Sequence, residues 1–289
     1  MLGKLLKHEW KATWRVGGIM LLGLALVSLF GWIAFQAPMW QSMANDSYYD
    51  RFNMWDLFSL GTLFMYIMML IGLNYGIIIY MSVRFYKTMY TDEGYLTHTL
   101  PVSKHQILIS KILNSGLWYV LMELGVVLSV FILIFSMMSA FLPDGYTWAD
   151  VWDMIGSEMW QYINEAFRDI FGMTAGGYFG MLLLISLVNP FCSMIILFGA
   201  ISLGQLFTKH RVLMAIVSYV GIMIVANIIS SVVRSVFSMN LMMNYSSDNA
   251  LAGGYMNVTV WTSTILSVIE AVGLYFVSYY VTSKKLNME

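Results

Sequence analysis

The sequence has very little charge and almost no cysteine. Of its 289 residues 59% are hydrophobic and only 11% are charged, and Cys192 is the single cysteine. An average soluble domain is about a quarter charged, so this composition argues against a soluble fold. One cysteine excludes both an internal disulfide and a cysteine-ligated metal site.

Several catalytic motifs are also missing. No G-x-x-x-x-G-K-[ST] phosphate-binding loop occurs, and His8-Glu9 does not continue into the H-E-x-x-H pattern of zinc proteases. The other histidines, His98, His105 and His210, fall in or beside polar connections, so no apolar segment supplies the base that a serine nucleophile needs. The sequence therefore predicts no enzyme active site, no bound cofactor, no metal site and no nucleic-acid partner.

What the chain does have is six long apolar segments separated by short polar connections. Each exceeds the roughly 20 residues that a helix needs to cross a bilayer, and none has the polar face of a soluble helix. The sequence thus predicts an all-α integral membrane protein with a single six-span transmembrane domain over residues 1–289. The segments are Val16–Ala37, Leu57–Val83, Ile107–Ala140, Tyr178–Phe207, Val212–Val233 and Val258–Thr282.

The charges are divided between the two sides of these segments. Because Lys and Arg of short loops stay in the cytoplasm, the basic side is predicted to be cytoplasmic, together with both termini. Most of the acidic residues, such as Asp144, Asp153 and Glu165, fall on the opposite side. The basic side contains Lys4, Lys7, Lys11, Arg15, Arg84, Lys87, Lys104, Lys111, Lys209, Arg211, Lys284 and Lys285.

Two segments outside the spans have an amphipathic pattern. Residues 1–15 place apolar and basic side chains on opposite faces, which indicates either a helix in the inner membrane interface or a basic flank that only sets the topology. Residues 141–177 form the longest outer loop, and their three- and four-residue apolar spacing predicts a helix. This outer helix would rest on the membrane, cap the spans or recognise a cationic peptide or drug. The apolar face of residues 1–15 consists of Leu2, Leu5, Leu6, Trp10 and Trp14.

A third segment, residues 235–257, is polar and too short to span. It predicts a short re-entrant or surface helix on the outer side.

A few polar or kinking residues lie within the apolar segments. Glu123 and Glu270 are near the middle of the third and sixth spans, where ionisable groups are costly and usually face the bundle interior or a watery path. We expect them either to line a translocation path, with Arg234 as a possible partner, or to be protonated and bonded to a neighbouring helix. Pro190 predicts a kink in the fourth span, acting as a hinge or a static bend.

The cytoplasmic connection between the second and third spans, residues 84–106, carries the most specific pattern. Its charged residues exclude it from lipid, while Tyr95, Leu96 and Leu100 offer an apolar surface. Ser103 is a candidate N-cap of the third span, with Gln106 three residues later. A short surface helix followed by a turn is expected here. An apolar patch rimmed by charge usually marks a partner.

This connection resembles the permease subunits of bacterial ABC transporters of the type-2 exporter class. The resemblance rests on Asp92-Glu93-Gly94-Tyr95-Leu96, on Thr99-Leu100-Pro101-Val102-Ser103-Lys104 and on Ser110-Lys111. It implies that Thr91–Leu100 is a coupling helix that docks into a groove of a separate ATP-binding subunit, which uses ATP and Mg²⁺. It also implies a second permease subunit, identical or different, and an interfacial helix over residues 1–15.

Two functions follow as expectations. The first is the transmembrane subunit of an ATP-driven exporter in the bacterial cytoplasmic membrane, with a peptide, lipid or drug as substrate. The alternative is a non-transporting membrane sensor or immunity protein that binds a peptide or lipid at its outer face.

Overall fold

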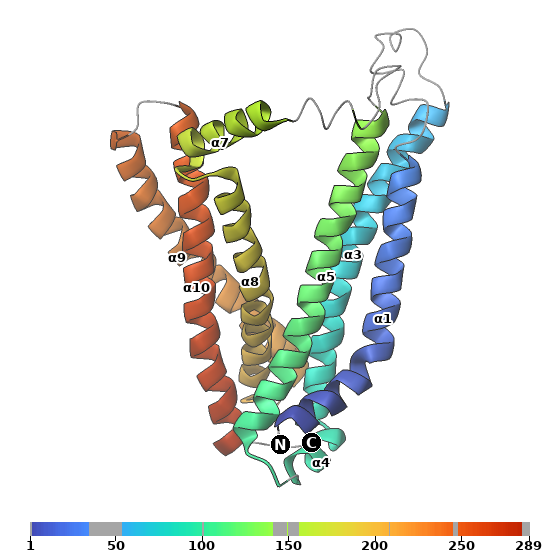
Figure 1. The fold of residues 1–289 in the computed structure, drawn as a ribbon. Helices are drawn as coiled ribbons and strands as arrows, with labels where there is room; N and C mark the ends of the chain where they lie inside the picture. The colour runs from blue at the N-terminus through green and yellow to red at the C-terminus, as the bar shows by residue number, and fades with distance from the viewer. Residues whose placement is uncertain are drawn as a thin grey trace. The chain divides into compact units, whose positions relative to one another are not determined.

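The computed structural model of the protein describes residues 2–34, 54–99, 101–140, 149, 156–207, 209–244 and 248–284. Within these ranges the secondary structure is entirely helical (Figure 1). The helices are α1 (Leu2–Ala34), α3 (Met54–Tyr90), α4 (Asp92–Thr99), α5 (Lys104–Ala140), α7 (Ser157–Phe171), α8 (Ala175–Gly204), α9 (Arg211–Asn244) and α10 (Asp248–Lys284).

Six of these helices, α1, α3, α5, α8, α9 and α10, are long enough and apolar enough to cross a membrane. Their number and order agree with the six predicted segments, so the prediction of an all-α fold with six helices able to span a membrane is confirmed for the described residues. The reason is physical, since a helix satisfies all its backbone hydrogen bonds within the segment and can therefore enter hydrocarbon.

Two segments that the sequence sets apart from the spans are instead part of the long helices. Residues 1–15 do not form a separate helix, because α1 continues without a break from Leu2 to Ala34. The predicted short helix over residues 235–257 is also wrong: α9 continues to Asn244 and α10 begins at Asp248. In both regions the long helix continues through residues whose side chains are polar. The membrane-interface placement of residues 1–15 stays a prediction.

The chain divides into two compact units. The first contains Met1–Lys7, Met81–Leu117 and Ile155–Glu289, and the second contains His8–Tyr80 and Trp118–Met154.

In the second unit, α1, α3 and α5 are joined by hydroxyl groups in an otherwise apolar interior. Ser28 donates to Ser129 at 2.8 Å, and the Tyr66 hydroxyl lies 2.8 Å from the same Ser129 oxygen. At another level, the buried indole of Trp118 donates to the Thr13 hydroxyl at 2.8 Å and stacks on Trp10 with ring centroids 4.6 Å apart. Such bonds matter because a buried polar group without a partner is costly.

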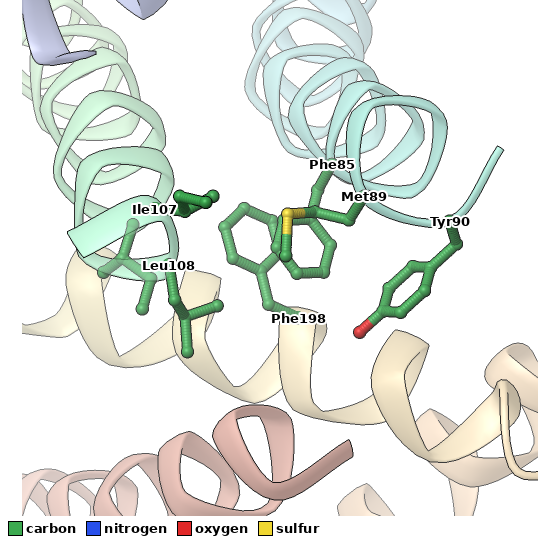
Figure 2. Packing of buried hydrophobic residues seen from close by; sticks show 7 residues of the cluster. Phe85, Met89, Tyr90, Ile107, Leu108 and Phe198 are labelled. Atoms are coloured by element: carbon green, nitrogen blue, oxygen red, sulfur yellow. The ribbon is translucent and has the colours of Figure 1, made fainter. Parts of the chain in front are cut away.

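In the first unit, an apolar cluster joins the end of α3, the start of α5 and the end of α8 (Figure 2). The rings of Phe85 and Phe198 stack with centroids 3.9 Å apart. The Tyr90 hydroxyl, buried beside them, lies 2.7 Å from the Ser202 hydroxyl. This cluster holds in place the two helix ends that α4 connects. Its buried members are Phe85, Met89, Tyr90, Ile107, Leu108, Ile112 and Phe198.

The predicted helix of the long outer loop is confirmed for Ser157–Phe171, which is α7. The earlier positions of that pattern, including Trp148 and Trp152, lie outside the described residues. α7 ends at Gly172, whose φ of 73° is the left-handed conformation that glycine adopts without strain.

Candidate functional site

The connection between α3 and α5 contains the short helix α4, which folds back onto the end of α3. Thr91 forms the bend, and the Gly94 amide donates to the Thr91 carbonyl at 2.7 Å. Gly94 is buried, and a Cβ at this position would lie 2.7 Å from both the carbonyl carbon and the oxygen of Met89. Only glycine permits this approach of two backbones, so the glycine of the predicted motif has a definite packing reason.

His98 ties α4 to both neighbouring helices. Its Nε2 lies 3.2 Å from the Met89 carbonyl oxygen, and its Nδ1 lies 2.7 Å from Nζ of Lys104, the first residue of α5. Because an ammonium only donates, Nδ1 accepts from Lys104 and Nε2 carries the proton that is donated to Met89. The Met89 carbonyl is one of the last four of α3, which have no partner within the helix, so His98 closes the end of α3.

This environment favours the neutral imidazole. Burial is the largest effect and lowers the pKa of His98. The positive charges of Lys104 and Lys111 lower this pKa further. The hydrogen bond to the Met89 carbonyl raises it, but by less than burial lowers it. The lysines act in this direction because a like charge disfavours protonation.

The outer face of α4 presents the apolar side chains that the sequence indicated. Tyr95 is 64% exposed and Leu96 is 69% exposed, and Asp92 and Glu93 beside them are exposed as well. α4 has eight residues and is not among the helices able to cross a membrane. Thr99 and Pro101 are also exposed, while Leu100 lies outside the described residues.

The start of α5 adds groups whose position the sequence did not reveal. Ser103 caps the helix as predicted, accepting from the Gln106 amide at 3.3 Å. Lys111 is only 5% exposed and donates to the Thr88 hydroxyl of α3 at 2.7 Å. A lysine two turns inside an apolar helix is the one signal in the sequence that indicates this buried position, and in the sequence analysis Lys111 supports only the topology and the resemblance.

The structure places the other predicted site residues at separate positions. Glu123 on α5 and Glu270 on α10 are both half-buried. Within the described parts of the chain, no ion pair joins Glu270 to Arg234 of α9. Pro190 is buried within the continuous helix α8, and the preceding Asn189 accepts a hydrogen bond from Ser267 of α10 at 3.4 Å. A role of these residues in a translocation path stays a prediction.

Among the described residues, no group of three or more His, Cys, Asp or Glu side chains is arranged to hold a metal ion. No protein-family model, no curated protein sequence and no solved structure matches the chain. Its function must therefore be argued from the geometry of α4 and from the resemblance of the connecting sequence.

Proposed function

We propose that this chain is the membrane-spanning permease subunit of an ATP-driven ABC exporter. The observation that carries the proposal is the geometry of α4, which exposes Tyr95 and Leu96 on one side and packs Gly94 against the backbone of Met89 on the other. A helix held in this way presents a rigid apolar surface to a partner. Aromatic anchors on a rigid element are typical centres of a protein–protein interface.

The contacts of α4 also provide a route for force. Pressure on Tyr95 and Leu96 would reach α3 through the contact of Gly94 with Met89, and α5 through the hydrogen bond of His98 with Lys104. The stacked rings of Phe85 and Phe198 extend this route to α8. A separate ATP-binding subunit would bind ATP and Mg²⁺, and this chain would convert the closure of that subunit into movement of the spans.

The charge distribution supports a cytoplasmic position of α4. The end of α3, the start of α5 and the ends of α8 and α10 meet within the first unit, as the contacts of Phe85 with Phe198 and of His105 with Tyr275 and Tyr279 show. Basic residues gather on these helix ends, and the positive-inside rule assigns such an end to the cytoplasm. The residues are Arg84, Lys87, Lys104, Lys209, Arg211 and Lys284. We place the protein in the bacterial cytoplasmic membrane, paired with a second permease subunit.

The test is co-purification in mild detergent from the native host, with mass spectrometry of the bound proteins. We expect a soluble subunit with a P-loop in a stoichiometric amount, and its loss on Tyr95→Ala or Leu96→Ala. Each substitution should weaken docking by about 2 kcal/mol, roughly 30-fold in Kd, and should leave folding nearly unchanged because both side chains are exposed.

Tyr255→Ala is the matched control, since Tyr255 of α10 is 50% exposed and lies outside the connection. It should retain the ATP-binding subunit. A preparation in which the wild-type chain brings no ATP-binding subunit would contradict the exporter proposal.

One observation favours the alternative, a non-transporting sensor or immunity protein. On α7, Trp160 is 50% exposed and Tyr162 is 72% exposed, so this helix offers aromatic side chains for a peptide or lipid. The two functions differ in energetics: transport requires ATP turnover by a partner, whereas sensing requires ligand binding without turnover.

A further inference from the structure

The helix α7 has one apolar face along its whole length. Residues three, four, seven and eleven positions apart lie on the same side of a helix. By this spacing Met159 shares a side with Ile163 and Ile170, and Trp160 shares an adjoining side with Phe167 and Phe171. Both sides belong to one face.

The C-terminal half of this face is covered by α8 and α10. The ring of Phe171 stacks on Tyr178 of α8 with centroids 4.2 Å apart, and Phe167 meets the same ring at 5.8 Å. On α10, a Cβ at Gly253 would overlap the carbonyl oxygen of Ile170. Asn257 of α10 donates to the Phe171 carbonyl at 3.0 Å, which closes the end of α7. This half is firmly attached.

Among the residues that the structure describes, the N-terminal half of the same face keeps exposed apolar side chains. Met159 is 39% exposed and Trp160 is 50% exposed, although both point to the side on which Phe167 and Phe171 are packed. The opposite side of α7 is polar, with Gln161, Glu165, Arg168 and Asp169 all exposed. The attached half therefore determines which way the exposed apolar side chains point.

The contacts also determine the depth of α7. Tyr178 is in the first turn of α8, and Gly253 and Asn257 are in the first three turns of α10, both of which are helices able to cross a membrane. Figure 1 shows α7 lying across the ends of α8 and α10. For helices that cross a membrane, the first turns lie where hydrocarbon meets headgroups, the level at which tryptophan and tyrosine are enriched.

We propose that Met159 and Trp160 insert into the lipid interface beside α8 and α10, so that α7 binds the membrane surface. Its polar side then faces water, as in other interfacial helices. The proposal selects one of the roles expected for the outer helix, and it does not depend on the exporter function, because it concerns lipid contact alone.

The test uses single cysteines in a Cys192→Ala background, which removes the only native cysteine. Nitroxide labels at Met159→Cys and Gln161→Cys are compared in vesicles of phosphatidylethanolamine and phosphatidylglycerol. The measured quantities are collision rates with oxygen, which concentrates in lipid, and with a water-soluble nickel chelate. At Met159→Cys we expect severalfold greater access for oxygen than for nickel, and at Gln161→Cys the reverse.

Two results would overturn the proposal. If nickel reaches the label at Met159→Cys as readily as at Gln161→Cys, the face is in water. If neither reagent reaches it, protein covers the face instead of lipid. Trp160→Cys places the label on the adjoining side of the same face, and it replaces Met159→Cys in the experiment if that variant does not fold. Each variant must match the parent in gel filtration.

Discussion

Gly94 of α4 lies directly against the backbone carbonyl of Met89, near the end of α3, so that the two helices are in contact through their backbones. A Cβ at Gly94 would come within 2.7 Å of the Met89 carbonyl carbon and oxygen. Since both neighbouring atoms belong to the backbone, no side chain can move aside to make room. The position of Tyr95 and Leu96 on the opposite side of α4 follows from this contact.

The first prediction concerns this contact. Gly94→Ala should destabilise the packed position of α4 by about 1–3 kcal/mol, the usual cost of overpacking. Hydrogen exchange of the α4 amides should then rise by roughly 5- to 150-fold. Gly72→Ala in α3 is the control, because no heavy atom lies within 4 Å of a Cβ there. Equal exchange in the two variants would show that the Gly94 contact does not hold α4.

The second prediction concerns pH. The pKa of His98 is lowered in the folded protein relative to its usual value of about 6.5. As the pH falls, His98 is therefore protonated at a higher pH when α4 is detached from α3 and α5 than when α4 is packed against them. The packed position of α4 should therefore be fully stable above about pH 7 and lose stability as the pH falls through 6.5 toward the lowered pKa. Protonation would turn Nδ1 into a donor facing Lys104.

Hydrogen exchange of α4 between pH 7.5 and 5.5, corrected for intrinsic rates, measures this effect. His98→Gln removes the titrating group and should flatten the pH dependence. His8→Gln, at an exposed position of α1, should keep the wild-type dependence. A wild-type profile in the His98→Gln variant would assign the pH effect to another group.

The third prediction concerns the packing of α1. A Cβ at Gly17 would lie 2.5 Å from the ring of Trp118, which is itself held by Trp10 and Thr13. Gly17→Ala should cost about 1–3 kcal/mol and lower the midpoint of thermal unfolding in detergent. Gly18→Ala has open space around its Cβ and should be neutral or stabilising, because alanine favours the helix. The reverse order of the two midpoints would contradict the packing of α1 on α5.

The fourth prediction concerns the carboxyl groups within the spans. If Glu123 and Glu270 line a translocation path, Glu123→Gln and Glu270→Gln should each reduce transport and alter its pH dependence. Transport can be followed as the resistance that the protein confers on cells exposed to antimicrobial peptides or drugs. Should both variants keep the wild-type resistance and pH profile, the two side chains have a structural role only.

The sequence was sufficient for the class of fold and for the exposed part of the site. Six helices able to cross a membrane follow from the length of the apolar segments, because hydrocarbon requires about 20 apolar residues in a row. The N-cap at Ser103 could be predicted from the sequence because it is a contact between residues three positions apart. The exposure of Tyr95 and Leu96 could be predicted because charged residues flank them in a short connection between two spans.

Only the tertiary structure decided how these parts are held. The sequence predicts helix ends where side chains turn polar, yet α1, α9 and α10 extend beyond those points, because backbone hydrogen bonds form regardless of side-chain polarity. The bond of His98 to Lys104 and Met89, the approach of Gly94 to Met89 and the direction of the exposed apolar side chains of α7 depend on how helices pack. Packing joins residues that the sequence keeps apart, so no local pattern records it.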